Sequence, residues 1–285
     1  MIGSQKSLYD DFDMMEKLME DPKVLMAYWI REREHIRLRK QSLHKPWSHD
    51  PIFQKTYFTN VHREDDKVTK FIRNWTVGLA QVEFWTMVAR FINWPDTLEC
   101  IDVDRGVVGI QDALEYQYSF GRKIWGSAYI VSTCGQKVDK RAYFVDLTRE
   151  WRINLERGVY GLPEDHTCEA YHNWFLKMRG FSDFMAAQVV ADLKHTPNHV
   201  LEMAPDFYTF AKPGPGSLRG LAWYYGLKKV SKKDFDHLIR RAHQELKLST
   251  QFEMQDLQNC FCEFDKYMRI LHGTGKSKRS YPGTA

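Results

Sequence analysis

Residues 176–193 read LKMRGFSDFMAAQVVADL, and this stretch indicates how the chain folds. Gly180, Ser182 and Ala186 have the G-x-G-x-x-x-A spacing of a helix-hairpin-helix motif, with serine in place of the second glycine. In that motif a tight turn presents backbone N–H groups at a helix N-terminus, where they bind a DNA phosphate. The pattern fits equally a glycine that ends one helix before an amphipathic second helix. Asp192 lies on the apolar side of that second helix, where a carboxylate is costly unless it is paired.

Helical spacing of apolar residues extends over most of the remaining chain. Asp21-Pro22 predicts the start of a helix that runs to about Gln41. Further helices are expected over 65–91, 110–120, 167–178, 182–193, 218–226, 232–246 and 252–271. The exception is 123–148, where two β-branched or aromatic runs flank a CGQK turn and predict a small β-hairpin or an irregular insertion. We therefore expect a mainly α fold, with one helical domain over 1–272 and a basic, flexible tail over 273–285.

The composition narrows the class of protein. Apolar residues make up 43% of the 285 residues, which permits a sizeable core and argues against global disorder. No apolar run reaches the length of a membrane span, and the N-terminal residues lack the layout of a secretory signal. Five irregularly spaced cysteines predict free thiols in a reducing cytoplasm rather than a disulfide framework. The net charge is only +4, but basic blocks at 31–40 and 228–233 suit an anionic partner, or else form solvated helix faces.

The first basic block, WIREREHIRLRK at 29–40, places Arg33 and Arg37 four residues apart on one helix face. Guanidinium groups present paired donors to phosphate oxygens, so Arg31, Arg33 and Arg37 are candidates for a phosphate-binding ridge. A solvated face with local glutamate partners explains the pattern equally well.

The stretch YFTNVHREDDKV at 57–68 is unusually dense in ionisable groups. Asn60, Arg63 and Asp66 fall at i, i+3 and i+6, so a helix would turn them roughly one way. One interpretation is structural, with Asn60 capping a helix and the acids near its positive end. The other is functional, with Arg63 binding a phosphate and Asp66 orienting or deprotonating a nucleophile.

Two later motifs are also ambiguous. KPGPGSLRGL at 212–221 offers Gly214, Gly216, Ser217 and Arg219 as an anion-binding nest, or as a plain loop-to-helix turn. CEFDKYMR at 262–269 places Lys266 beside acidic neighbours, an arrangement that ordinary helix ion pairs explain equally well. No histidines stand at metal-ligand spacing on one element, so no metal is expected beyond a Mg²⁺ brought by a phosphate substrate.

The order of these motifs resembles one family. PWSHDPI, YFTNVHREDD, GFSDFMAAQVVADL, GPGSLRGL and CEFDKYMR follow one another as in the α-glutamyl/putrescinyl thymine pyrophosphorylases of bacteriophages, also called amino acid:DNA transferases. The resemblance extends over about 27–281, and PWxxDPI with FTNVxRExD is its specific part. It implies a fold related to helix-hairpin-helix DNA glycosylases, in a phage protein of the host cytoplasm.

The resemblance also implies a reaction on double-stranded DNA carrying modified thymine. A free amino acid or other amine displaces pyrophosphate from pyrophosphorylated 5-hydroxymethyluracil, without a membrane and with the enzyme expected as a monomer. The roles it implies for particular residues follow in one sentence. Arg31, Arg33, Arg37, Asn60, Arg63 and Lys266 would bind pyrophosphate, Asp66 or Asp192 would take the proton of the amine, Trp47, Tyr57 and Phe58 would stack on a flipped base, and Gly180, Ser182, Gly214, Gly216, Ser217 and Arg219 would bind the DNA backbone.

Two other functions remain open. One is a DNA glycosylase or lyase, although Asp192 lies closer to the hairpin than the catalytic aspartate of those enzymes does. The other is a non-catalytic DNA-binding module, such as the helical partner domain of a hydroxymethyluracil DNA kinase.

Overall fold

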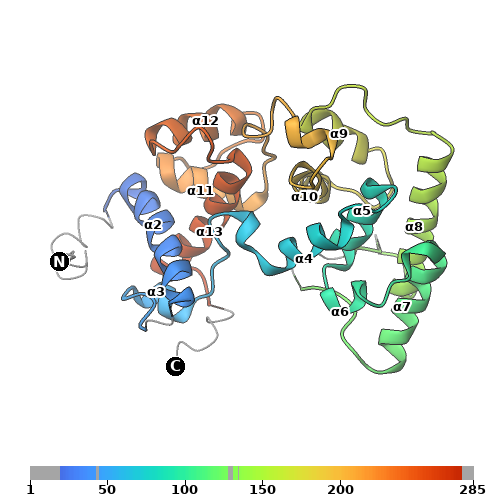
Figure 1. Cartoon of the computed structure of the whole chain (residues 1–285). Helices are drawn as coiled ribbons and strands as arrows, with labels where there is room; N and C mark the ends of the chain where they lie inside the picture. The colour runs from blue at the N-terminus through green and yellow to red at the C-terminus, as the bar shows by residue number, and fades with distance from the viewer. Residues whose placement is uncertain (1–19, 43–44, 128–130, 134, 278–285) are drawn as a thin grey trace. The chain divides into compact units, whose positions relative to one another are not determined.

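The computed structural model describes residues 20–42, 45–127, 131–133 and 135–277, and all regular secondary structure in those ranges is helical (Figure 1). The chain divides into two compact units. Residues 1–63 and 213–285 form a discontinuous unit, and residues 64–212 form an inserted unit between its two halves. Such a division does not test whether the two units act as one domain, so the single domain over 1–272 stays a prediction. Most of the predicted tail, at 278–285, lies outside the described residues.

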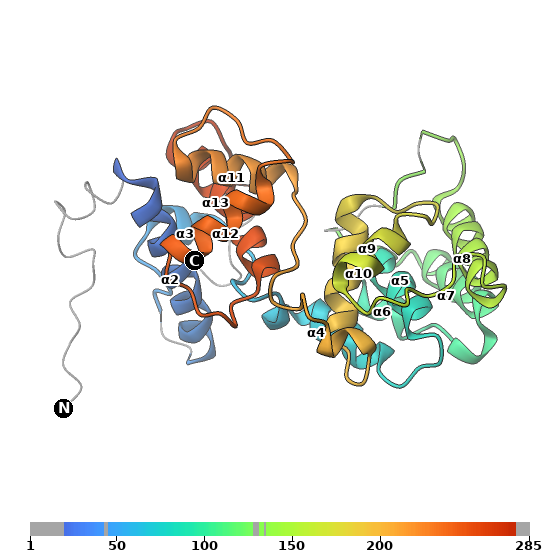
Figure 2. The same cartoon turned by 90° about the horizontal axis from the view of Figure 1, so that it is seen from above.

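The discontinuous unit is built from both ends of the chain. Its helices are α2 (Pro22–Gln41), α3 (Pro51–Lys55), α11 (Pro215–Tyr225), α12 (Phe235–Glu245) and α13 (Met254–Leu271). The start predicted at Asp21-Pro22 is confirmed, because the Asp21 carboxylate accepts a hydrogen bond of 2.8 Å from the Lys23 N–H. Figures 1 and 2 both show α11 beside α13.

Aromatic packing fixes the core of this unit. Trp29 and Phe58 are fully buried and meet edge to face with ring centroids 5.8 Å apart. Phe53 lies 5.0 Å from Phe58 and 5.6 Å from Tyr267, so the same cluster joins α2, α3 and α13. Each pair of this kind contributes about 0.5–1.5 kcal/mol beyond the burial of area.

The inserted unit has its own hydrophobic core. Its helices are α4 (Lys67–Thr76), α5 (Val82–Ile92), α6 (Pro95–Leu98), α7 (Val107–Ser119), α8 (Lys140–Glu156), α9 (Cys168–Phe175) and α10 (Asp183–Lys194), with the 3-10 turns η3 (Val103–Arg105) and η4 (Val200–Met203); a further turn, η2 (Arg63–Asp65), lies at the boundary of the units. Phe84, Phe144, Trp151 and Phe175 from α5, α8 and α9 are fully buried in this core. Hydrophobic burial therefore supports the inserted unit without side chains from the other unit.

The hairpin predicted at 123–148 is wrong in its second half. Residues 140–148 lie in α8, and no strand occurs in the described part of 123–148. The Asp139 carboxylate caps this helix by accepting hydrogen bonds from the N–H groups of Arg141 and Ala142. Tyr143, Phe144 and Leu147 then share the buried face, because spacings of three and four residues align on a helix.

In the part of the chain that the structure covers, none of the helices combines the length and the apolar composition needed to cross a membrane.

Candidate functional site

The segment Tyr57–Arg63 of the discontinuous unit is held by hydrogen bonds from two helices. Arg33 of α2 is only 3% exposed, and its Nε donates to the main-chain carbonyls of Phe58 at 3.2 Å and Thr59 at 2.8 Å. The Arg33 Nη2 donates to the side-chain oxygen of Asn60. Arg33 and Asn60 were predicted to bind pyrophosphate, but here they fix the path of the segment.

Helix α13 holds the same segment from its other side. Asn259 Nδ2 donates to Thr59 Oγ1 at 3.0 Å, and Glu263 Oε2 accepts from the Thr59 N–H at 3.2 Å. Lys266 Nζ donates to the Tyr57 carbonyl and lies 3.4 Å from Glu263. Lys266, also predicted to bind pyrophosphate, therefore takes part in an internal clamp.

The end of the segment is fixed by Asp256, which is 4% exposed. Its carboxylate accepts a 3.0 Å hydrogen bond from the main-chain N–H of Arg63 and lies 3.0 Å from His62 Nδ1. The sequence gave no signal for Asp256, because it lies 193 residues from Arg63 along the chain.

The PWSHDPI motif is tied to the same two helices. Asp50 caps α3, and its second carboxylate oxygen accepts from Tyr267 at 2.7 Å and from Tyr28 at 3.3 Å. Ser48 donates to the buried Glu32 at 2.5 Å. Both signature motifs that carry the family resemblance thus pack against α2 and α13.

The three aromatics predicted to stack on a base are placed differently. Phe58 is fully buried in the aromatic core, so no base reaches its ring without unfolding of the cluster. Trp47 and Tyr57 are partly exposed and share one cation, since Lys40 Nζ lies 4.9 Å and 6.0 Å from their ring centroids. Lys45 Nζ lies 5.5 Å from the Trp47 ring. We call Lys40, Lys45, Trp47 and Tyr57 the basic–aromatic cluster.

The remaining predicted cations of α2 differ in exposure. Arg31 is exposed, and its Nε donates to the Ala27 carbonyl at 3.3 Å. Arg37 forms a bidentate pair with Glu34, at 2.8 and 3.0 Å from Nε. Burial opposes ionisation of Glu34, but the hydrogen bond and charge of Arg37 outweigh it and hold the pKa of that carboxyl below its usual value. Arg31 is therefore the more accessible of the two.

Asp66 of the inserted unit caps α4. Its carboxylate accepts a hydrogen bond of 2.9 Å from the Thr69 N–H. Its neighbour Asp65 lies 3.5 Å from Lys70. The capping interpretation of the acidic residues is thereby confirmed for Asp66 rather than for Asn60. A role of Asp66 in proton transfer stays a prediction.

Asp192 has the partner that its burial requires. The Arg90 guanidinium binds it through both nitrogens, with Nε 2.6 Å from Oδ2, and both side chains are at most 1% exposed. Arg90 also donates to Asn93 at 3.0 Å and Thr69 at 3.3 Å, so the pair joins α4, α5 and α10. This geometry gives the carboxylate a structural task, and the predicted catalytic role of Asp192 stays untested.

The turn at 176–182 joins α9 to α10. Gly180 has φ +89°, a conformation that favours glycine, and a Cβ there would lie 3.2 Å from Leu147 Cδ1. Ser182 caps α10 and is exposed. Two helices around a glycine turn are thus present, while the wider glycosylase-like fold is not established by this element.

The GPGS loop has a packing task. Gly216 and Gly220 face α13, where an added Cβ would lie 2.3 Å from Cys262 Sγ and 2.0 Å from the Phe261 carbonyl oxygen. Ser217 is buried and bonds to Gly214 in a turn closed at 3.0 Å. Arg219 pairs with the buried Asp265 at 2.9 Å. The buried positions of Gly214, Gly216 and Ser217 explain the motif through helix packing, and their predicted contact with DNA stays a prediction.

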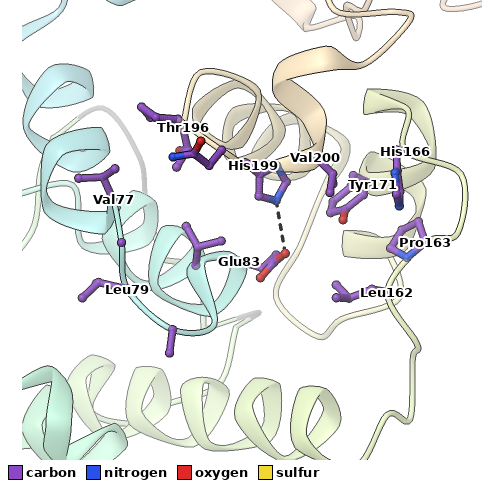
Figure 3. Close-up of a pocket in the computed structure, with 15 residues that line it drawn as sticks. Val77, Leu79, Glu83, Leu162, Pro163, His166, Tyr171, Thr196, His199 and Val200 are labelled. Atoms are coloured by element: carbon purple, nitrogen blue, oxygen red, sulfur yellow. Dashed lines mark hydrogen bonds and ion pairs between the residues drawn. The ribbon is translucent and has the colours of Figure 1, made fainter.

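A cavity of about 640 Å³ lies within the inserted unit (Figure 3). Glu83 of α5 reaches His199, whose Nε2 is 3.3 Å from Glu83 Oε1, and Tyr171 of α9 stacks edge to face on the imidazole at 5.5 Å. Burial raises the pKa of Tyr171 to about 12. Sequence reasoning missed this group, because its members come from three distant elements and form no motif.

Neither a metal centre nor a nucleotide loop is evident in the described residues. No group of three or more His, Cys, Asp and Glu there could hold a metal ion. Residues 273–277 read GTGKS, like the end of a phosphate-binding loop, but Ile270 occupies the position of the first glycine. The segment also follows helix α13, whereas such loops follow a strand.

Comparisons with known proteins point to one family. A family model described as "5-hmdU DNA kinase, helical domain" matches residues 23–277. The 5-hmdU DNA kinase of Bacillus phage SP10 is 24% identical over 298 residues, which is 88% of this chain and 46% of that kinase. The chain thus spans less than half the length of this curated relative. No solved structure gives a significant match.

Proposed function

The chain belongs to the family of 5-hmdU DNA kinase helical domains, and from this membership we propose that it acts on 5-hydroxymethyluracil in phage DNA. The observation that carries this proposal is the match over 23–277, since it includes both clamped motifs and the whole inserted unit. The related kinase, by its name, acts on 5-hmdU in DNA. Without the strand-and-loop setting of a nucleotide site in the described residues, phosphate transfer is the less supported chemistry for this chain.

The reaction we propose is an amine transfer. The nitrogen of a neutral amine attacks the exocyclic methylene carbon of pyrophosphorylated 5-hydroxymethyluracil. The C–N bond forms, the C–O bond breaks, pyrophosphate leaves with the bonding electrons, and the nitrogen releases a proton to a base. Cations lower the barrier of such a step by stabilising the charge that develops on pyrophosphate, which a Mg²⁺ carried by that group would also do.

The basic–aromatic cluster supports contact with a base taken out of the stack. Trp47 and Tyr57 offer partly exposed rings, and Lys40 and Lys45 place ammonium groups beside them. A flipped base stacks on aromatic side chains, and its flanking phosphates attract cations. Arg31 is the most accessible of the predicted pyrophosphate ligands on α2. Asp66 is the remaining candidate base, because Asp192 is committed to Arg90.

A second candidate is a DNA-binding module that serves a kinase without turnover of its own. It is favoured by the match to less than half of the related kinase. Lys228, Lys229 and Lys233 are exposed between α11 and α12, and among the described residues no ion pair is given for them. Such lysines bind phosphates irrespective of sequence, with an affinity that falls steeply as salt rises. Contacts of Gly180 and Ser182 with the DNA backbone, a monomeric state and a location in the host cytoplasm belong to both candidates as proposals.

Nucleoside mass spectrometry separates the candidates. The chain is incubated with DNA carrying pyrophosphorylated 5-hydroxymethyluracil and a panel of amino acids and polyamines. A mass gain equal to one amine, with release of pyrophosphate, is the expected result. Unchanged nucleosides despite salt-sensitive DNA binding would favour the accessory module, and loss of the base would favour a glycosylase. Trp47→Ala should reduce turnover, while Tyr208→Ala, at an exposed aromatic of the inserted unit, serves as control.

A further inference from the structure

The cavity of the inserted unit carries an unusual charge. Glu83 is an acidic residue in its wall, and among the described residues that line it none is lysine or arginine. An anionic ligand such as a phosphate or a carboxylate would find no cation there. The wall therefore favours a positively charged ligand.

Glu83 is held as an anion by its neighbours. Its side chain is 15% exposed, and one carboxylate oxygen faces His199 Nε2 at 3.3 Å. The other imidazole nitrogen, Nδ1, accepts a hydrogen bond of 3.2 Å from the Leu201 N–H, which places the ring proton on Nε2. The imidazole is then a neutral donor to Glu83, and the pair keeps a net charge of −1.

The pKa of Glu83 agrees with this geometry. Burial acts to raise it, but the hydrogen bond from His199 and that from the main chain at the start of α5 outweigh burial, so the pKa lies below its usual value. Glu83 is therefore ionised at neutral pH.

The remaining wall is suited to a carbon chain. Figure 3 shows Leu162, Pro163 and Tyr171 on the side of the cavity that faces Glu83. An aromatic ring and apolar side chains cover methylene groups, while a carboxylate attracts an ammonium group. The volume of about 640 Å³ is within the range of small-molecule sites.

We propose that this cavity binds a cationic amine without a carboxylate group, such as an aliphatic diamine, with its ammonium on Glu83. The proposal rests on the amine transfer proposed above, for which it names the class of donor. Amino acids are disfavoured, because their carboxylate would enter a site that has an anion and no cation.

Direct binding tests the assignment without any reaction. Putrescine is titrated into the full chain by calorimetry, beside 1,4-butanediol, which has the same length without charge, and glycine, which adds a carboxylate. We expect putrescine to bind, and the other two to bind at least tenfold more weakly. Equal binding of butanediol or glycine would overturn the proposal.

Two variants locate the site. Glu83→Gln removes the charge and should weaken putrescine binding at least tenfold. Leu162→Lys adds a cation at a position that is 53% exposed, so it should weaken binding equally while leaving the Glu83–His199 pair and the fold in place. Glu150→Gln, at an exposed ion pair outside the cavity, should have no effect. Unchanged affinity in Leu162→Lys would show that putrescine binds elsewhere and overturn the proposal.

The failure of the pocket and of the proposed function are distinguishable. Amine transfer by the Leu162→Lys and Glu83→Gln chains at the wild-type putrescine dependence would overturn the pocket and leave the transferase standing. Putrescine bound through Glu83 by a chain that transfers no amine would support the pocket and overturn the transferase.

Discussion

The pair of Arg90 and Asp192 is the most demanding residue-level feature of the inserted unit. Both charges are almost fully buried, so removal of one leaves the other without compensation. We expect Asp192→Asn to lower the free energy of unfolding by about 3–5 kcal/mol in urea denaturation. Glu150→Gln, which breaks the exposed pair with Arg179, should cost no more than about 1 kcal/mol. An Asp192→Asn chain with wild-type stability and no turnover would instead favour the catalytic role predicted for Asp192.

The cysteines provide a pH-dependent test. Burial raises the pKa of Cys262 to about 11 and that of Cys260 well above its usual value, whereas Cys100 is exposed. A thiol with that pKa has about one thiolate in a thousand at pH 8, and the thiolate is the reactive form. In a Cys134→Ser chain, Cys100 should react with a disulfide reagent first, and Cys262 should react about tenfold faster for each pH unit below 11. Rapid reaction of a second thiol at pH 8, lost in Cys262→Ser, would contradict this.

Single residues could be predicted where their task is local. The need of Asp192 for a partner follows from its apolar surroundings in the sequence, but Arg90 lies 102 residues away and no spacing rule identifies it. Arg33, Asn60 and Lys266 were recognised as a polar group, yet their donors serve the backbone of Tyr57–Arg63. A sequence shows that a guanidinium is present, and only the fold shows what it binds.

At the scale of elements, the packing of α11 on α13 depends on two small residues. A Cβ at Gly220 would lie 2.0 Å from the Phe261 main-chain oxygen, which cannot move without displacing α13. We expect Gly220→Ala to destabilise the chain by about 1–3 kcal/mol, measured as a lower melting temperature in calorimetry. Gly161→Ala is the matched control, because no atom lies within 4 Å of its added Cβ. If both variants melt like the wild type, α11 and α13 are less closely packed than the structure indicates.

Helices with capping residues were predictable, and the mixed segment was not. Asp21-Pro22 located the start of α2, since capping is a local interaction. The run AYFVDLT is rich in β-formers, and it is nevertheless helical because Asp139 caps it and the core of the inserted unit buries Phe144 and Leu147. Tertiary packing overrides strand propensity here.

At the scale of the whole molecule, the chain leaves one unit at residue 63 and returns to it at 213. The sequence offered no sign of this path, because no stretch rich in glycine, proline or serine marks either crossing. Hydrophobic periodicity predicts the helices but does not tell which of them share a core. The family resemblance gave the right area of biology for a related reason: motifs in both units keep their order even though the units divide them.

The division predicts that the inserted unit folds by itself. Its core draws only on residues within 64–212, and the Arg90–Asp192 pair lies entirely inside it. A fragment of residues 64–212 should therefore show helical circular dichroism and one cooperative urea transition. It should also retain putrescine binding, because every residue that lines the cavity belongs to it. The same fragment with Asp192→Asn is the control and should unfold at markedly lower urea. A wild-type fragment without a cooperative transition would mean that the inserted unit needs the discontinuous unit to fold, and that the chain behaves as the single domain predicted from its sequence.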